Sequence, residues 1–412
     1  MIDLALLRDD HKRVIDLLKL KEPSFDAQRL FDLDAALRDI KIEVEALRHK
    51  KNELAQQGKG GITDELRAAS VEVGKALKTK ETELEQQEAE FKKLYLSCPN
   101  IPNDDIPAGN KEANKVVKVI GSQPVYNFEV KNHLELGTKL GWFDFERATQ
   151  MTGSNFALYR GDAVKMIYSL AMLMLKNNIK HGFEPVLPPY LVNEQSLLVA
   201  SNFPKFRDQV YAMPEDELFL SPTAEVNLAN MYRDQILAVD ELPIRMTSWT
   251  SCFRREAGGY GATERGLIRI HQFEKVELYT ICEPENSPDE LDRMIACAEE
   301  ILQLLGLHYR ISLLAMQDCS FPSARTFDIE VWLPGQKAYY EVSSCSNCTD
   351  FQARRGKIRY KKQVDAKTSL VHTLNASSLA LPRLMVAIIE TYQQADGSIA
   401  IPEVLKKEGL YT

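Results

Sequence analysis

The sequence lacks the features that mark membrane, secreted and common nucleotide-binding proteins. Its 412 residues contain no apolar run of the roughly 20 residues that span a bilayer. The first residues, MIDLALLRDDHKRV, lack the basic start and apolar stretch of a signal peptide, so we expect a cytoplasmic protein without membrane association. There is neither a GxxxxGK followed by Ser or Thr nor a GxGxxG that opens a helix after a strand. P-loop and dinucleotide-binding folds are therefore disfavoured.

Cysteine is scarce and forms no obvious framework. The seven cysteines are an odd number scattered along a long chain, which favours reduced thiols over disulfides. Only Cys345 and Cys348 form a CxxC pair, and no second pair at similar spacing completes a structural zinc site. We interpret these two thiols as part of a strand and the turn that follows it.

Positive charge is also in deficit. The formal net charge is −8 and the sequence pI is about 5.6, which argues against a general nucleic-acid binder. A local basic surface that binds RNA remains compatible with these values. The length and the hydrophobic fraction of 44% predict two or more domains with substantial cores.

A helical hairpin is predicted for residues 27–96, which are rich in Ala, Glu, Lys, Leu and Gln and contain no proline. The apolar residues recur at alternating spacings of three and four, which is typical of a coiled-coil seam. The first seam comprises Leu30, Leu33, Leu37, Ile40, Val44, Leu47 and Leu54. The second comprises Leu66, Val73, Leu77, Leu84, Phe91 and Leu94. Glycines within 57–61 favour a turn between the helices, and Thr63 is placed to cap the second helix.

This hairpin has two interpretations that its own residues do not separate. Each helix can bury its narrow apolar stripe only on the other, so the pair should project as an arm of roughly 45 Å at 1.5 Å per residue. The arm is either a rigid spacer or dimerisation element, or a structure that reaches a large partner.

The rest of the chain predicts an α+β fold with an antiparallel sheet and flanking helices. Proline, Asn, Asp and Gly in 97–112 indicate a linker, so we place domain boundaries at 1–100, 101–114 and 115–412. Beyond the linker, β-type runs alternate irregularly with helical stretches. The runs are 184–192, 267–281 and 326–335, and the helical stretches are 162–180, 287–305 and 379–394.

The residues best suited to bind a nucleotide are found in the segment 250–279. Arg254 and Arg269 should emerge at the two ends of a hairpin and converge on one face, where two guanidiniums suit phosphate oxygens. Gly258, Gly259, Gly261 and Gly266 would let the backbone approach a nucleotide closely, and Phe273 offers a ring on which a base can stack. A surface hairpin with ordinary ion pairs is the alternative interpretation.

The order of the motifs resembles that of the seryl-tRNA synthetases, class II aminoacyl-tRNA synthetases of the bacterial type. Phe253-Arg254-Arg255-Glu256 with RGLIRIHQFEKVE (265–277) resembles motif 2, and KHGFEPVLPPYLV (180–192) resembles motif 1, the interface strand of that family's homodimer. SPTAEV (221–226), EVWLPGQKAYYEVSSCSNCTDFQARR (330–355) and HTLNASSLALPRLMVAIIE (372–390) resemble the serine-binding segment, the metal and ATP segment, and motif 3. The hairpin resembles the arm that binds serine tRNA in the family, so the resemblance implies that residues 1–100 form a tRNA-binding domain.

The resemblance also implies site residues. Those implied for serine are Thr223, Ala224, Glu225, Glu277 and Ser377. Those implied for ATP are Arg254, Arg255, Glu256, Arg269, Phe273, Glu341, Val342, Ser343, Ser344 and Arg383, with Mg²⁺ held by Glu341 and Ser344. Arg254, Arg383 and Glu341 are the implied catalytic residues. The implied reaction joins serine to ATP as seryl-adenylate and then to tRNA(Ser); whether tRNA(Sec) is also charged stays open.

Motif 3 departs from the family pattern at three positions. Ala376 and Ser378 stand where the family usually has glycine, and Pro382 stands where it has glycine before the arginine. Extra Cβ atoms at 376 and 378 are expected to crowd a backbone that approaches substrate, and Pro382 removes an N–H. Activity is still expected, because the contacting residues remain. The alternative is a synthetase-derived protein that binds RNA or a partner, or loads an amino acid onto another carrier, without charging tRNA.

Overall fold

The computed structural model describes residues 1–256, 266–408 and 410–411, and the chain divides into two compact units, Met1–Pro99 and Asn100–Thr412. Within these described ranges, every helix is too short or too polar to cross a membrane. All seven cysteines are buried thiols.

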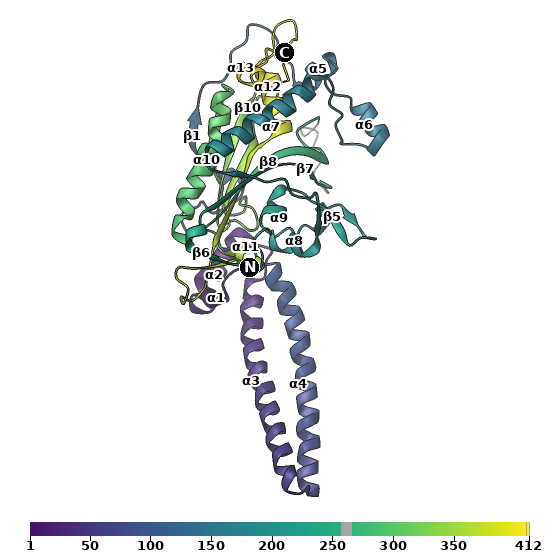
Figure 1. Ribbon diagram of the computed structural model, residues 1–412, viewed down its shortest axis with the longest axis vertical. Coiled ribbons are helices and arrows are strands. Elements are labelled where there is room, and N and C mark those ends of the chain that lie inside the picture. The colour runs from purple at the N-terminus through teal and green to yellow at the C-terminus, as the bar shows by residue number, and fades with distance from the viewer. Residues whose placement is uncertain (257–265, 409, 412) are drawn as a thin grey trace. The chain divides into compact units, whose positions relative to one another are not determined.

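The first unit contains the predicted hairpin of two long antiparallel helices (Figure 1). They are α3 (Ala27–Gln57) and α4 (Asp64–Leu96), joined through the short turn η1 (Gly58–Gly60). The predicted cap is confirmed, since the Thr63 hydroxyl accepts a hydrogen bond of 3.2 Å from the Leu66 N–H. Two shorter helices precede the hairpin, α1 (Leu4–Asp9) and α2 (His11–Lys21).

The hairpin is held by a narrow seam, as the heptad pattern predicts. Leu37, Ile40 and Val44 of α3 pack with Leu77 of α4, and the less buried Leu47, Leu84 and Phe91 extend the same stripe. Lys80 interrupts the seam by pairing with Glu43 across the two helices and with Glu83 in its own helix. A polar residue at a seam position is thus tolerated because the seam is only partly buried.

The second unit is built on an eight-stranded sheet in the order β1-β9-β10-β11-β14-β8-β7-β2. Neighbouring strands are antiparallel, which confirms the predicted sheet, except that β2 runs parallel to β7. The strands are β1 (Lys115–Ile120), β2 (Glu184–Pro185), β7 (Ile244–Phe253), β8 (Gln272–Cys282), β9 (Tyr309–Leu313), β10 (Arg325–Leu333), β11 (Ala338–Asn347) and β14 (His372–Ala380).

A group of three helices packs against the sheet to form the main core. It comprises α7 (Asp162–Lys180), α10 (Ser287–Leu304) and α12 (Leu381–Thr391); all three contact the strands, and α7 also contacts both α10 and α12. The predicted helices 162–180 and 287–305 match α7 and α10 closely. The predicted helix 379–394 starts too early, because residues 379 and 380 still belong to β14 and pair with β8.

A second core lies among several of the smaller elements of this unit. The remaining helices are α5 (His133–Lys139), α6 (Phe145–Thr152), α8 (Glu194–Val199), α9 (Ala224–Leu228), α11 (Phe351–Gly356) and α13 (Glu403–Lys406). The remaining strands are β3 (Leu191–Asn193), β4 (Ala212–Met213), β5 (Leu218–Leu220), β6 (Ile236–Ala238), β12 (Arg359–Lys361) and β13 (Ser369–Leu370). The predicted run 184–192 forms only β2 and the start of β3, because Pro188 and Pro189 between them cannot donate to a ladder.

Candidate active site

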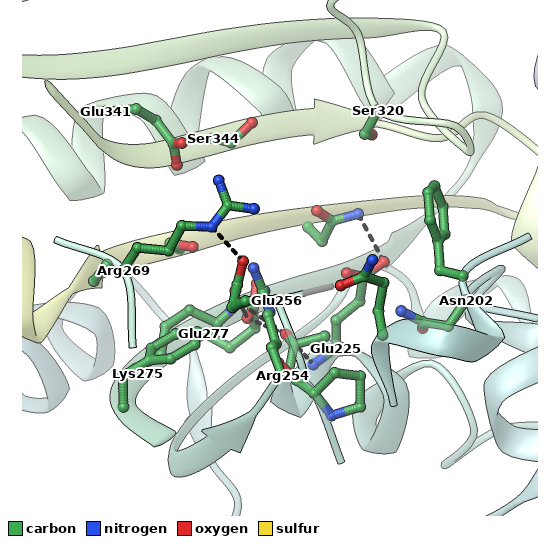
Figure 2. Close-up of a pocket in the computed structure, with 18 of the residues that line it drawn as sticks. Asn202, Glu225, Arg254, Glu256, Arg269, Lys275, Glu277, Ser320, Glu341 and Ser344 are labelled. Carbon is green, nitrogen blue, oxygen red and sulfur yellow. Dashed lines mark hydrogen bonds and ion pairs between the residues drawn. The ribbon is translucent and has the colours of Figure 1, made fainter. Parts of the chain in front are cut away.

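A cavity of about 480 Å³ lies over the middle of the large sheet. Its walls come from β8, β11 and β14, the ends of the β7–β8 hairpin, the start of α9 and the first turn of α12. Figure 2 shows the charged residues that line it, including Glu225, Lys275 and Glu277 in one cluster and Glu341 beside Ser344 on another strand. Segments from most of the second unit therefore meet at this cavity.

Strand alternation on β8 decides which residues reach the cavity. Successive side chains of a strand point to opposite faces. Phe273, Lys275 and Glu277 accordingly line the cavity, whereas Val276 and Leu278 lie in the main core with the helices. The same alternation on β14 sends Ser377 to the cavity, directly opposite Glu277 in the strand pairing.

A buried polar network surrounds Thr223, the residue that caps α9. The Thr223 hydroxyl donates to Glu277 Oε2 over 2.8 Å and accepts from Lys275 Nζ over 2.7 Å. It also accepts from the Glu225 backbone N–H over 3.2 Å. Lys275 forms a close ion pair with Glu277, and both side chains are almost fully buried. A small polar ligand with an ammonium and a hydroxyl would meet carboxylates and fixed dipoles here.

Glu225 is the second carboxylate of this cluster and lacks a paired cation in the described structure. Its Oε1 accepts hydrogen bonds from Gln352 Nε2 (2.7 Å) and Asn375 Nδ2 (3.2 Å). Burial, with repulsion from Glu277, raises the pKa of Glu225 to about 7. An incoming ammonium would favour the charged form of this carboxyl, so the position suits binding of a cationic group.

The arginines predicted from the hairpin do converge on the cavity. Arg254 lies with its guanidinium 5.2 Å from the ring centre of Phe273 and donates from Nε to the Pro222 carbonyl over 3.2 Å. Arg269 Nε binds Glu256 Oε2 at 2.6 Å. Both arginines line the cavity, so two permanent cations face the space beside an aromatic ring. The predicted glycines 258, 259 and 261 lie outside the described residues.

Arg383 enters the cavity from the first turn of α12. Its Nη1 contacts Glu341 Oε2 at 3.0 Å and the Glu341 carbonyl at 2.9 Å, and its Nε donates to the Ile268 carbonyl over 3.2 Å. These contacts fix the guanidinium between β11 and the segment that returns from the hairpin loop. The cavity therefore has a third arginine, and this set of guanidiniums suits an anionic ligand such as a polyphosphate.

The donor chemistry near Glu341 fits a divalent cation of the magnesium type. Glu341 and Ser344 both line the cavity and offer oxygen ligands, which such hard cations prefer. Asp328, opposite Ser344 in the strand pairing, has a buried Oδ1 without a hydrogen-bond partner in the described structure. Burial, followed by repulsion from Glu341, holds the pKa of Asp328 well above its usual range, so this carboxyl favours its neutral form unless a cation binds nearby.

A dedicated protein cage for a metal is not found among the described residues, where no group of three or more His, Cys, Asp or Glu side chains is placed to hold an ion. Mg²⁺ commonly binds through one or two carboxylates and takes its other ligands from water and substrate phosphates. Glu341 and Ser344 are oxygen donors of the kind that a protein contributes to such a site.

The crowding that we expected at motif 3 is not found, because the side chains at 376 and 378 lie on the other side of the strand from the cavity. Ala376 packs in the core, and Ser378 Oγ donates to Asn178 Oδ1 over 2.9 Å, so both side chains point away from the cavity. Alternation along β14 explains this, because Asn375 and Ser377 take the cavity side. Pro382 lines the cavity in the first turn of α12, where a missing N–H breaks no helical hydrogen bond.

Four of the residues implied for substrate binding do not place their side chains in the cavity. Ala224 and Val342 are packed in the interior, and Ser343 Oγ donates to the Ser377 carbonyl over 2.5 Å. Arg255 turns toward Tyr211, with its guanidinium 5.8 Å from that ring centre. The other residues implied for serine and ATP all line the cavity; they are Thr223, Glu225, Glu277, Ser377, Arg254, Glu256, Arg269, Phe273, Glu341, Ser344 and Arg383.

Among the polar residues of the site that the sequence analysis missed, three contact its central network or lie beside it. Lys275 stands two residues from both Phe273 and Glu277, so strand alternation alone would have placed it with them. Asn375 stands two residues before Ser377 on the same face of β14. Gln352 comes from α11 and reaches Glu225 from a distant part of the chain, and no local pattern marks it.

Family models match both units of the chain. A model described as the seryl-tRNA synthetase N-terminal domain matches residues 1–102. A model described as the tRNA synthetase class II core domain (G, H, P, S and T) matches residues 209–392.

Full-length relatives and a solved structure agree with these models. The chain is 44% identical to a serine–tRNA ligase of Desulfotalea psychrophila, over 98% of this chain and 96% of the relative. It is 42% identical to serine–tRNA ligase 2 of Clostridium acetobutylicum, over 99% and 98%. The crystal structure of a seryl-tRNA synthetase from Pyrococcus horikoshii complexed with ATP superposes with a TM-score of 0.92 at 33% identity, covering 99% of this chain and 98% of that one.

Proposed function

The chain belongs to the seryl-tRNA synthetase family, and from that premise we propose how its residues join serine to tRNA. The activity is that of a ligase that uses ATP and serine. One observation carries the assignment of roles: Thr223, Glu225 and Glu277 share a cavity with Arg254 and Arg383. An amino-acid subsite and an anion subsite thus lie side by side.

In the first step, the serine carboxylate attacks the α-phosphorus of ATP, and the bond to the pyrophosphate leaving group breaks. Arg254 and Arg383 neutralise charge on the phosphate oxygens, which requires no side-chain nucleophile. Phe273 stacks against the adenine and Glu256 accepts from its amino group. In the second step, the terminal ribose hydroxyl of tRNA attacks the seryl carbonyl and AMP leaves.

The carboxylates select serine. Glu225 and Glu277 receive the ammonium and the hydroxyl of the amino acid, with Ser377 beside Glu277. Alanine is rejected because it would leave these buried polar groups unpaired, at about 1–3 kcal/mol for each group.

Mg²⁺ is the metal that Glu341 and Ser344 would hold, and when bound it supplies positive charge beside the phosphates. The chain's own contribution is to keep Arg383 against Glu341, so that cationic and anionic groups are fixed before the substrates arrive.

The arm formed by α3 and α4 is proposed to bind the tRNA. Its cations fall into two sets in the described structure. Lys41, Arg48 and Lys80 are paired with glutamates of the opposite helix. No ion pair involves Lys50, Lys51, Lys59, Arg67, Lys75 or Lys78 in the described arm, so these are available for phosphates.

We further propose a cytoplasmic homodimer built through residues 180–192. In support, Leu187 is 82% exposed and Tyr190 41% exposed, although both are apolar residues of the segment that resembles the family's interface. A twofold assembly would bring the same patch of each subunit together. Analytical ultracentrifugation at micromolar concentration should give twice the chain mass, and a monomer would contradict this proposal.

The decisive experiment is ATP–pyrophosphate exchange followed by tRNA charging. Exchange should require both serine and Mg²⁺, and the labelled serine should then appear on tRNA(Ser). Exchange without charging would favour a protein that loads serine onto another carrier. No exchange from folded protein would contradict the synthetase activity itself.

A further inference from the structure

We propose that Lys275 is a positioning residue that sets the serine selectivity of the site. It does so by occupying one oxygen of Glu277 and by fixing the direction of the Thr223 hydroxyl. The inference rests on the proposed function of the cavity and adds to it a residue that the serine-binding set did not include.

The hydrogen-bonding capacity of Thr223 is fully used inside the protein. A hydroxyl has one hydrogen to donate and two lone pairs to accept with. Lys275 Nζ, at 2.7 Å, and the Glu225 backbone N–H, at 3.2 Å, occupy the two lone pairs. The hydrogen must therefore go to Glu277 Oε2, 2.8 Å away. Thr223 acts on serine through Glu277, and its hydroxyl is not itself a serine ligand.

The two oxygens of Glu277 are left in different states. Oε2 receives the Thr223 hydroxyl and forms the ion pair with Lys275. No partner for Oε1 is found in the described part of the chain. Because Glu277 lines the cavity, Oε1 is the oxygen that can accept from the ligand. Lys275 and Thr223 thus decide which oxygen serine meets.

Charge matching gives Lys275 a second effect. The serine subsite contains the carboxylates of Glu225 and Glu277, and Lys275 balances one of them. The remaining single negative charge matches the single ammonium of an amino acid. The residues opposite Lys275 on the two neighbouring strands are Thr250 and Ala380, and neither supplies a compensating charge. Without Lys275, two buried carboxylates would compete for one cation.

A purely structural ion pair would also explain the burial of Lys275, so the test must separate binding from folding. We would compare Lys275→Met with Arg245→Met. Arg245, on the adjacent strand β7, forms a largely buried pair with Glu290 of α10 (2.6 Å), and it does not line the cavity. Both variants remove one cation of the sheet from a largely buried ion pair, and the melting temperature of each is measured.

Lys275→Met should raise the KM for serine roughly 10- to 100-fold in the exchange assay, the range for losing a charge-assisted hydrogen bond. The KM for ATP should change less than twofold, and the preference for serine over alanine should fall in proportion. Arg245→Met should lower the melting temperature with the KM for serine unchanged. Equal serine KM values in Lys275→Met and the wild type would overturn the inference while leaving the synthetase activity intact.

Chemical rescue provides a second variant with a sharper readout. Lys275→Ala removes the equivalent of a propylammonium ion from a residue that lines the cavity. Added propylammonium should lower the KM for serine of this variant severalfold, whereas propanol at equal concentration should not. Rescue by both compounds would show that filled space is what matters, and the role of the charge would be wrong. A wild-type protein without exchange would instead contradict the proposed function.

Discussion

The helical arm and the catalytic sheet both contain ion pairs, which join two helices in the arm and two residues of β8 in the sheet, and the two regions bury them very differently. In the arm, the side chains of Arg48 and Glu81 are 57% and 40% exposed. In the sheet, those of Lys275 and Glu277 are 7% and 2% exposed. A basic side chain paired with a glutamate is therefore screened by water in the arm and isolated from water in the sheet.

This difference separates two uses of charge. Exposed pairs contribute about 0–1 kcal/mol, so in the arm they adjust the register of the helices while the apolar seam holds them together. A buried pair is stable only while both partners are present, because an unpaired charge in the interior is strongly unfavourable. A substitution that removes a charge in the cavity should therefore change catalysis. A substitution that removes a charge in the arm should change the affinity for a large partner and should affect the stability of the arm only weakly.

The largest effect is expected at Arg254. Arg254→Ala should slow ATP–pyrophosphate exchange by about 10²–10³-fold, because the loss of one preorganised contact to the charge that develops in the transition state typically reduces the rate by this factor. Arg255→Ala provides the matched control, since the neighbouring guanidinium lies against Tyr211 and not in the cavity. Rates are compared at saturating serine and ATP. Equal losses in the two variants would mean that charge near the loop matters and position does not.

The next effect concerns the two sets of arm cations. Replacing Lys50, Lys51 and Lys59 by Gln should raise the KM for tRNA on the order of tenfold and reduce the salt dependence of binding. Each lost phosphate contact lowers the slope of log K against log salt by about 0.9. The control replaces Lys41, Arg48 and Lys80, whose charges are already paired with glutamates.

Serine activation without tRNA should be unchanged in both triple variants, because the cavity lies in the other unit. Equal tRNA affinities in the two variants would remove the distinction between paired and unpaired cations. Unchanged affinity in both would make the arm a spacer.

The pH dependence of serine use should report Glu225. Its pKa is raised to about 7, so the carboxyl is mostly neutral below this value and charged above it. Serine's ammonium needs the charged form. The kcat/KM for serine should therefore rise about tenfold per pH unit up to about 7 and then level off. Glu225→Gln should be less active and should lose this rise. A wild-type profile that is flat between pH 6 and 8 would contradict the assignment.

The hairpin and the sheet were largely predictable because their signals are local. The heptads at Leu37, Ile40 and Val44 and the cap at Thr63 each depend on neighbours within a few residues. Arg254, Arg269 and Phe273 could be anticipated from the pattern of a single hairpin. The residues that other strands and helices bring to the cavity could be anticipated only through resemblance, since they lie far apart in the sequence. Gln352 illustrates the limit, because its contact with Glu225 depends on the whole fold.

Two of the wrong or missing predictions concern residues whose side-chain direction follows from the alternation along a strand. Alternation along β14 would have sent Ala376 and Ser378 to the core, and alternation along β8 would have brought Lys275 into the cavity. Other features had no local signal. Leu379 follows a β-bulge with φ of 141°, a conformation that tertiary contacts impose against the preference of leucine.

The smallest predicted effect concerns an exposed ion pair of the arm. Glu81→Gln removes the partner of Arg48, whose guanidinium binds it at 2.8 Å, and should reduce the opening free energy of the arm by only about 0.2–1 kcal/mol. Hydrogen exchange of α3 and α4 amides in the full chain measures this quantity, and the difference from the wild type should vanish at high salt. Leu77→Ala is the control, because Leu77 is buried in the seam and its truncation should weaken the same amides by about 2–5 kcal/mol. A loss from Glu81→Gln that matches the loss from Leu77→Ala would mean that the arm is held by its charges, and the contrast with the buried pairs of the sheet would fail.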